Sequence, residues 1–334
     1  MRRFEFFAPQ SLQEAVALLR ERGDGVKLIA GGTDLTVQMK EAGLHPPAVV
    51  SLHALPELRG IEFEETRGLR VGAGALMGDI AAHDAVRARY SAIADGAAVV
   101  GSVQTRNLAT IGGNIANAAP SADTAPGLIV FDAVAEVLGP GGTRELPVLD
   151  IFAGPGRTTL ARDEIIVAFR AATPAPNTGS VYQRHTPRKI MDIAAVGVGV
   201  RLTLDGGSIR EARICLGAVA PTPIRAPEAD EALLGQPPSE ALFERAAALA
   251  QGAATPISTS TWKVPISLSS RPPDRGRCRG SASSSHRRGS AGTPPSRARR
   301  RSGSKPPASA WRRARTAPPT VAARRAPFPL AACG

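Results

Sequence analysis

The sequence predicts an α+β fold followed by a disordered basic tail. Two observations predict the mixed class: segments with apolar residues at helical spacing alternate with short apolar runs, and several of those runs end at glycine pairs. The third observation is the charge distribution of the 334-residue chain, whose net charge is +12. Residues 259–334 hold 17 Lys and Arg against one acidic residue, which leaves a net charge of −4 for residues 1–258.

The basic tail, residues 259–334, is rich in Ser, Pro and Arg and shows neither helical nor strand periodicity. A segment of this composition cannot bury enough apolar surface to fold, so we expect it to be disordered. Two other interpretations stay open, namely an out-of-frame translation of a GC-rich gene and a polybasic arm for nucleic acid or anionic lipid. Aromatic residues that could stack on bases are limited to Trp262, Trp311 and Phe328.

The remaining composition argues against several classes of protein. There is no apolar run of about 18 residues and no apolar signal core at the N-terminus, so we expect a cytoplasmic protein without a membrane span. Cys215, Cys278 and Cys333 include no C-x-x-C spacing. A disulfide framework and a cysteine-ligated zinc or iron–sulfur site are therefore not expected, and we predict no metal site in this chain.

The first part of the chain begins with an amphipathic helix. Ser11 and Glu14 have the spacing of a capping box, and apolar residues then recur at helical spacing up to Gly23. Apolar, partly β-branched runs predict the first strands, each bounded by turn residues. We expect strands at 26–30 and 48–52, a strand or hairpin region at 58–76, a helix at 35–43, and helical stretches around 77–89 and 92–100.

Residues 101–133 hold the densest cluster of small residues and turn formers before the tail, and such backbone can approach a ligand closely. Strand-like alternation follows at 135–139, 143–152 and 163–169, and the run from Pro174 to Gly179 predicts a linker at a domain boundary. Beyond it, apolar runs in 194–220 predict antiparallel strands joined at Asp205-Gly206-Gly207. A helix at 240–254 completes a small second domain.

Two glycine pairs carry the strongest chemical signal. They lie in Ala30-Gly31-Gly32-Thr33-Asp34 and Thr110-Ile111-Gly112-Gly113-Asn114, each after an apolar stretch and each followed by a hydroxyl or amide side chain. Successive N–H groups in such turns can converge on phosphate oxygens with no Cβ in the way, so the two loops together suit a pyrophosphate. Neither loop has the GxGxxG or Walker A pattern, and each pair by itself is also compatible with a plain tight turn.

Other polar residues give weaker signals. His83 and His185 stand in no motif that indicates covalent attachment of a cofactor, and we expect ordinary surface or helix histidines. The adjacent acids Asp163-Glu164 and Glu64-Glu65 point in different directions on any backbone, so acid–base catalysis is not predicted and we expect these carboxylates to be solvated. We assign no catalytic residue to this chain.

Three ordered motifs carry a family resemblance: LIAGGTDL at 28–35, TIGGNIANAAPSAD at 110–123 and YQRHTPRKIMDIAAVGVGVRL at 182–202. With them, residues 2–257 resemble the FAD-binding medium subunit of the molybdenum hydroxylases, of the xanthine dehydrogenase and carbon monoxide dehydrogenase type. The resemblance implies a two-subdomain FAD-binding domain of the vanillyl-alcohol-oxidase (PCMH) type and a small C-terminal α/β domain. The implied divisions are 1–55 and 56–176 for the two subdomains, 177–258 for the C-terminal domain of the CO dehydrogenase flavoprotein type, and 259–334 for the tail.

The resemblance also implies a set of FAD contacts. Both glycine loops would wrap the FAD pyrophosphate, Asp123 would accept hydrogen bonds from ribityl or ribose hydroxyls, and Ile166 would contact the flavin ring. Arg184 stands where the family often has Lys and would stabilise a reduced flavin or bind phosphate. The plain structural alternatives are an N-cap role for Asp123, core packing for Ile166 and a solvated charge for Arg184. The implied cofactor-binding residues are Leu28, Ile29, Ala30, Gly31, Gly32, Thr33, Asp34, Leu35, Thr110, Ile111, Gly112, Gly113, Asn114, Asp123, Ile166 and Arg184.

By the same resemblance, the protein is an oxidoreductase subunit that transfers electrons and does no substrate chemistry of its own. FAD would be bound non-covalently, while the molybdenum cofactor and two [2Fe–2S] clusters would lie on a large and a small partner subunit, in a dimer of heterotrimers. Two alternatives remain: a polybasic nucleic-acid- or membrane-binding protein on a flavin-fold scaffold, and a stand-alone FAD oxidoreductase. The main interpretation expects no nucleic acid partner.

Overall fold

The computed structural model describes residues 2–188 and 191–256, and every structural statement below concerns those residues. They lie within one compact unit, Met1–Pro273. The predicted basic tail, residues 259–334, falls outside the described residues. Within the described ranges, no helix is both long and apolar enough to cross a membrane.

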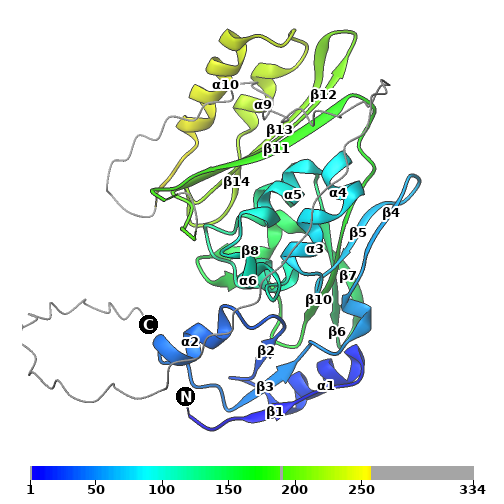
Figure 1. The fold of residues 1–334 in the computed structure, drawn as a ribbon, viewed down its shortest axis with the longest axis vertical. Helices are drawn as coiled ribbons and strands as arrows, with labels where there is room; N and C mark the ends of the chain where they lie inside the picture. Colours follow the sequence, from blue (N-terminus) through cyan, green and yellow to red (C-terminus); the bar gives the residue numbers. More distant parts are fainter. Residues whose placement is uncertain (1, 189–190, 257–334) are drawn as a thin grey trace, which may run out of the picture. The chain divides into compact units, whose positions relative to one another are not determined.

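The chain begins with a small parallel sheet of strand order β1-β3-β2, covered by helix α1 (Figure 1). The predicted capping box forms, because the Ser11 side chain accepts from the Glu14 N–H at 3.2 Å and Gly23 closes the helix at φ +68°. The strands predicted at 26–30 and 48–52 and the helices predicted after Ser11 and at 35–43 are confirmed within a few residues. Their bounds are β1 Glu5–Phe7, α1 Leu12–Arg22, β2 Lys27–Ile29, α2 Leu35–Glu41 and β3 Ala48–Ser51.

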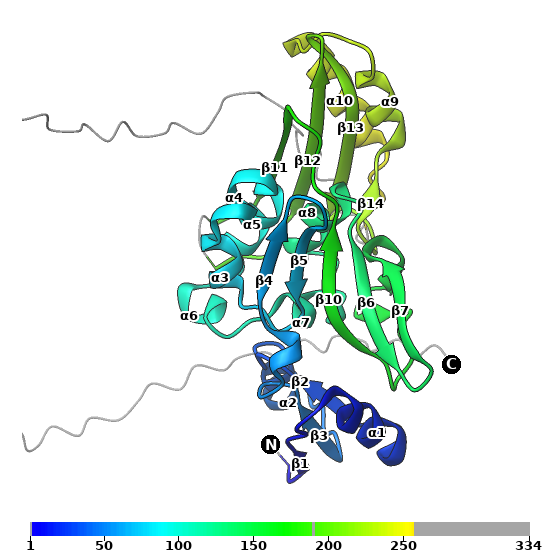
Figure 2. The same cartoon turned by 90° about the vertical axis from the view of Figure 1, so that its right-hand side faces the viewer.

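A five-stranded antiparallel sheet of order β4-β5-β10-β6-β7 forms the middle of the chain, with helices against one of its faces (Figure 2). The predicted hairpin region at 58–76 contains the antiparallel pair β4 and β5. The sheet strands are β4 Ile61–Glu64, β5 Gly68–Gly72, β6 Val134–Gly139, β7 Gly142–Pro147 and β10 Ile165–Ala171, with a separate small pair β8 Phe152–Gly154 and β9 Arg157–Thr158.

The helices of this middle part confirm the helical stretches expected around 77–89 and 92–100. The first stretch consists of two helices, because the extended backbone of His83 (φ −68°, ψ 123°) ends one helix and begins the next. The turn-rich run 101–133 contains three further short helices. The bounds are α3 Met77–Ala82, α4 Asp84–Arg89, α5 Ser91–Ala98, α6 Val103–Arg106, α7 Ile111–Ala116 and α8 Thr124–Val130.

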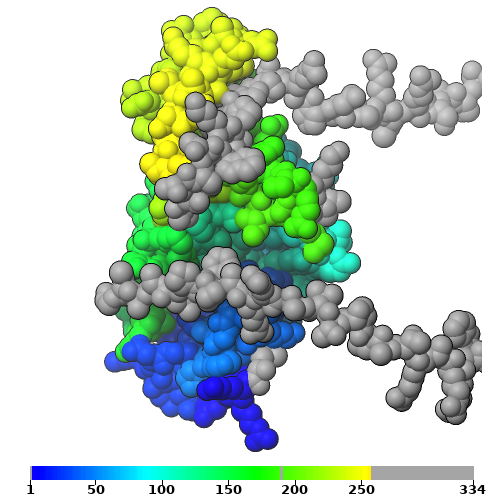
Figure 3. All heavy atoms as spheres, turned by 90° about the vertical axis from the view of Figure 1, so that its left-hand side faces the viewer, coloured from blue at the N-terminus to red at the C-terminus, as the bar shows by residue number. Residues whose placement is uncertain are grey.

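The chain then builds an antiparallel sheet of order β11-β12-β13-β14, on which α9 and α10 pack through a separate apolar core. The hairpin predicted at Asp205-Gly206-Gly207 forms: Asp205 pairs with Ser208, and both glycines have positive φ, as a two-residue turn of this kind requires. The bounds are β11 Thr178–His185, β12 Val196–Asp205, β13 Ser208–Gly217, β14 Ile224–Arg225, α9 Pro227–Leu233 and α10 Glu240–Gly252. In Figure 3 green and cyan residues of the middle of the chain separate yellow α10 from the blue N-terminal residues.

Helix α8 connects this sheet to the middle of the chain. All seven of its residues are buried, and it packs against α5 on one side and against β12 and β13 on another. Small residues permit this close approach, because a Cβ on Gly199 would lie 2.9 Å from the Pro126 carbonyl oxygen and one on Gly127 would lie 2.6 Å from the Ala92 carbonyl oxygen. The sheet β11-β12-β13-β14, called the C-terminal sheet below, therefore packs on α8, which the preceding part of the chain also buries.

Candidate functional site

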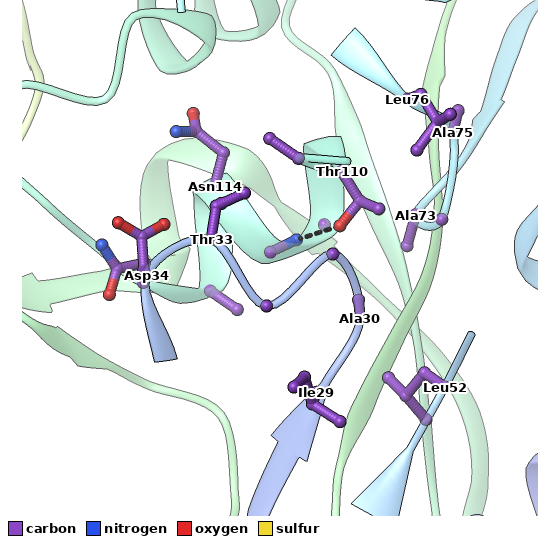
Figure 4. Close-up of a pocket in the computed structure, with 18 of the residues that line it drawn as sticks. Ile29, Ala30, Thr33, Asp34, Leu52, Ala73, Ala75, Leu76, Thr110 and Asn114 are labelled. Carbon is purple, nitrogen blue, oxygen red and sulfur yellow. Dashed lines mark hydrogen bonds between the residues drawn. The ribbon is translucent and has the colours of Figure 1, made fainter. Parts of the chain in front are cut away.

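A cavity of about 1030 Å³ lies where the two glycine loops meet, at the upper end of the size range of small-molecule sites. Its walls come from the end of β2, the turn before α7, the segment between β5 and α3, and the start of β10 (Figure 4). The two loops, far apart in sequence, thus face one site, as the glycine-pair pattern predicted.

The first glycine loop needs both of its glycines. A Cβ on Gly31 would lie 1.9 Å from the Leu108 carbonyl oxygen, and Gly32 has φ +71°. Thr36 donates through its hydroxyl to the Gly32 carbonyl at 2.7 Å, which ties the loop to the first turn of α2. The close approach of Gly31 to the Leu108 backbone places the loop against the residues that precede the second glycine loop.

The backbone N–H groups of this first loop have no acceptor among the described residues. This holds for four successive residues that line the cavity: Gly31, Gly32, Thr33 and Asp34. Unpaired backbone donors are costly unless water or a ligand accepts from them. Successive N–H groups on a glycine-rich turn are well suited to bind an anion by donating to it, since no Cβ of the glycines blocks its approach.

The second glycine loop uses its N–H groups internally. Ile111 donates to the Ala75 carbonyl at 3.1 Å, Gly112 to the Ala73 carbonyl at 2.8 Å, and Gly113 to the Thr110 hydroxyl at 3.2 Å. A Cβ on Gly112 would lie 2.6 Å from that of Ala73. This loop is therefore a rigid wall of bare backbone, whereas the first loop supplies the free donors.

Acidic side chains outnumber Lys and Arg among the described lining residues. An anionic ligand would therefore be bound mainly by backbone N–H groups rather than by cationic side chains. Among the described lining residues, the Lys and Arg side chains are Lys27 and Arg59, the histidines are His53 and His83, and the acidic side chains are Asp34, Asp79, Glu164 and Asp192. Desolvation raises the pKa of the Asp34 carboxyl above its usual range.

The Glu164 carboxylate accepts two hydrogen bonds from Arg144, at 2.7 and 2.9 Å, and these hydrogen bonds lower its pKa. The expectation that Glu164 is solvated is wrong, because its side chain is only 13% exposed.

The structure brings most, though not all, of the predicted site residues into the lining. Ile111 is fully buried in the core beneath the loop, and neither Asp123 nor Arg184 contributes to the cavity surface. Ile166 does line it, from the strand β10 next to a bulge in its pairing with β6. The predicted residues that line the cavity are Leu28, Ile29, Ala30, Gly31, Gly32, Thr33, Asp34, Leu35, Thr110, Gly112, Gly113, Asn114 and Ile166.

Asp123 and Arg184 instead contact each other behind the second loop. Arg184 donates to the Asp123 carboxylate at 2.7 Å, and the Tyr182 hydroxyl donates to its other oxygen at 2.8 Å. The Arg184 side chain is 8% exposed, which rules out the alternative of a solvated surface charge. Asp123 occupies the N-cap position of α8 without a capping hydrogen bond from its side chain. Burial next to Asp123 raises the pKa of Tyr182, which keeps its hydroxyl a donor.

Sequence reasoning missed part of the lining. Ala73, Gly74, Ala75 and Leu76 follow β5 into the cavity wall, Gly101 precedes α6 and Thr105 lies within α6. The glycine-punctuated run Gly72-Ala-Gly74-Ala is the sequence signal for this part of the wall, because it follows the hairpin and lets the backbone approach a ligand closely. Met191, Asp192 and Ile193, between β11 and β12, also contribute, and His83 lines the cavity from the break between α3 and α4.

Comparisons with known proteins identify related chains. Residues 2–171 match the family described as the FAD binding domain in molybdopterin dehydrogenase, and residues 182–263 match the CO dehydrogenase flavoprotein C-terminal domain. The chain is 35% identical over 228 residues to the xanthine dehydrogenase FAD-binding subunit of Escherichia coli O157:H7, covering 68% of this chain and 78% of that one. It is 36% identical over 234 residues to the carbon monoxide dehydrogenase medium chain of Hydrogenophaga pseudoflava, covering 70% and 81%.

Solved structures agree with these matches. The carbon monoxide dehydrogenase of Hydrogenophaga pseudoflava that lacks the Mo-pyranopterin moiety of its molybdenum cofactor superposes with a TM-score of 0.74 at 36% identity. The match covers 77% of this chain and 89% of that chain. The similarity thus extends over both sequence matches rather than over one loop motif.

Proposed function

The chain belongs to the family of FAD-binding medium subunits of molybdenum hydroxylases, and we propose that it binds FAD non-covalently in the cavity between its two glycine loops. In this role the protein is an oxidoreductase subunit, which receives electrons from [2Fe–2S] clusters of a partner subunit and passes them to an external acceptor. The resemblance found in the three motifs is confirmed by the family matches and the relatives.

One observation supports the FAD site above all others: the N–H groups of four successive residues, Gly31 to Asp34, find no acceptor in the described part of the chain and line a cavity of about 1030 Å³ opposite a second glycine loop. The pyrophosphate of a dinucleotide offers anionic oxygens that can accept from these donors. Residues of both glycine loops line this cavity, so a dinucleotide bound there would contact both loops. FAD, when bound, supplies the oxidation–reduction chemistry of the subunit.

The chain's own residues would bind and orient that cofactor. The first loop, 30–34, would donate to the pyrophosphate, while Thr110, Gly112 and Gly113 would form the surface against which it lies. Leu28, Ile29, Leu35 and Ile166 line the same cavity and would exclude water from the cofactor. Asp123 and Arg184, which contact each other and do not line the cavity, would contribute to FAD binding indirectly.

We further propose the assembly in which this subunit works. The relatives are named as the FAD-binding subunit of xanthine dehydrogenase and the medium chain of carbon monoxide dehydrogenase, which supports a multi-subunit complex. The partners would be a large molybdenum-cofactor subunit and a small [2Fe–2S] subunit, in a cytoplasmic dimer of heterotrimers. The proposed fold type is the two-subdomain PCMH flavin fold, 1–55 and 56–176, with the C-terminal domain at 177–258.

The test is the visible absorption spectrum of the purified full-length chain, repeated on the supernatant after acid precipitation. Released flavin with the mass of FAD supports non-covalent binding. Colour that stays in the pellet would contradict it and indicate a covalent flavin. A folded protein that remains colourless after addition of FAD would overturn the FAD assignment altogether. Titration of the apoprotein with FMN serves as the matched ligand control, because FMN lacks the pyrophosphate and should bind far more weakly.

A further inference from the structure

The first turn of α8 contacts two different parts of the protein at once. On one side, the Asp123 carboxylate accepts from Tyr182 at 2.8 Å and from Arg184 at 2.7 Å, both on strand β11. On the other side, the hydroxyl of the next residue, Thr124, donates to the Asn114 side-chain carbonyl at 2.6 Å. Asn114 directly follows the second glycine pair and lines the cavity.

These contacts join buried groups. Thr124 is 0% exposed, Asp123 is 7% exposed and Tyr182 is 6% exposed. Removal of one partner of a buried hydrogen bond leaves the other unsatisfied, so each of these contacts constrains its neighbours strongly. The tyrosine hydroxyl also lies against β12, because a Cβ on Gly197 would lie 2.4 Å from it.

The hydrogen bond from Thr124 determines which end of the Asn114 amide remains available. With the carbonyl oxygen accepting from Thr124, both N–H donors of the amide nitrogen remain, and no acceptor for them is present among the described residues. Donors directed at an anionic ligand attract it, whereas the carbonyl oxygen would repel it. The orientation of this amide therefore matters for a pyrophosphate.

We propose that Thr124 and Tyr182 are positioning residues of the FAD site: Thr124 orients the Asn114 amide toward the bound cofactor, and Tyr182 holds the first turn of α8 in place through Asp123. The inference rests on the proposed function and extends it. The C-terminal sheet thereby helps to determine the affinity for FAD, although neither Tyr182 nor Thr124 lines the cavity.

The experiment measures the Kd of the full-length apoprotein for FAD by quenching of flavin fluorescence, with circular dichroism as the check on folding. Thr124→Val removes the hydroxyl at nearly constant volume, and Thr124→Ser keeps it. We expect Thr124→Val to raise the Kd about tenfold, as the loss of one buried hydrogen bond allows, and Thr124→Ser to stay within about twofold of the wild type. Tyr182→Phe should raise the Kd by about three- to tenfold.

The chain offers a matched control for each change. Tyr90 is a fully buried tyrosine whose hydroxyl donates to the Ala172 carbonyl at 3.0 Å, away from the cavity. Thr203 is a buried threonine, 2.7 Å from the Thr178 hydroxyl, also away from the cavity. Tyr90→Phe and Thr203→Val should lower the thermal stability to a similar extent while leaving the Kd for FAD unchanged.

Two negative results have different meanings. If the wild-type apoprotein is folded and binds no FAD, the proposed function fails. If the wild type binds FAD and both Thr124→Val and Tyr182→Phe bind it equally well, the positioning role fails and the FAD site stands. A rise in Kd for the two control variants equal to that of the test variants would also overturn the proposal, since the effect would then follow stability alone.

Discussion

Gly31 and Leu108 bring the two glycine loops together: a Cβ on Gly31 would lie 1.9 Å from the Leu108 carbonyl oxygen. Leu108 precedes Thr110, the first residue of the second loop, by two positions. The contact thus sets the spacing between the backbone donors of the first loop and the wall formed by the second. Only a glycine permits so close an approach of two backbones.

Gly31→Ala should weaken FAD binding, because the added methyl group must push the two loops apart. Overpacking of this kind costs about 1–3 kcal/mol, which corresponds to roughly a five- to hundredfold rise in Kd if the strain falls on the site. Gly141→Ala is the matched control, since a Cβ there meets nothing within 4 Å and φ is not positive. Fluorescence titration of both apoproteins checks the prediction, which an unchanged Kd in Gly31→Ala would refute.

Gly199→Ala should loosen the C-terminal sheet from α8. Its Cβ would lie 2.9 Å from the Pro126 carbonyl oxygen, a contact that requires backbone movement and costs about 1–3 kcal/mol. Gly179 lies in the neighbouring strand β11 with nothing within 4 Å of its Cβ position, so Gly179→Ala should be nearly neutral. Urea unfolding of the two variants provides the comparison, and equal midpoints would contradict the tight seating of the sheet.

Glu164→Gln should destabilise the protein at neutral pH and not at low pH. Hydrogen bonds from Arg144 lower the pKa of Glu164 below its ordinary value of 4.5, so their contribution is present above that pH and is lost as pH falls through the folded-state pKa. Because Arg144 is 43% exposed, we expect only about 0.2–1 kcal/mol at pH 7. Denaturant unfolding between pH 7 and pH 3 measures this difference. Glu62→Gln, at an exposed glutamate, is the control, and a deficit that persists at pH 3 would exclude the ionic explanation.

Asp132→Asn should destabilise the contact between the end of α8 and the C-terminal sheet. The Asp132 carboxylate lies within 3.2–3.4 Å of guanidinium nitrogens of Arg201, Arg213 and Arg225, which come from three different strands. Without the carboxylate these like charges would repel one another. Asp132 is 52% exposed, so the loss should be about 1 kcal/mol and should shrink at high salt. Thermal unfolding at 0.05 and 1 M salt tests it, with exposed Asp150→Asn as the control; a salt-independent loss would point to packing instead.

The sequence was sufficient where the signal is local. The capping pattern of Ser11 and Glu14, the Gly206-Gly207 hairpin and the two glycine loops each follow from the backbone conformation that a few neighbouring residues prefer. The division of the helical stretch 77–89 at His83 is not visible in the sequence, because one extended residue between two helices leaves the apolar spacing nearly intact. The burial of Glu164 is not evident from the sequence, because its partner, Arg144, lies twenty residues earlier on strand β7.

The chemistry of the loops is already present in the amino-acid sequence, as glycine pairs with hydroxyl and amide neighbours in the motifs that identify the family. The folded chain adds which loop has N–H donors without an acceptor among the described residues, and that Asp123 and Arg184 contact each other rather than line the cavity. These features depend on contacts between distant segments, which choose the hydrogen-bond partners. The acceptors for the second loop are the Ala73 and Ala75 carbonyls, and no local pattern around Gly112 specifies them.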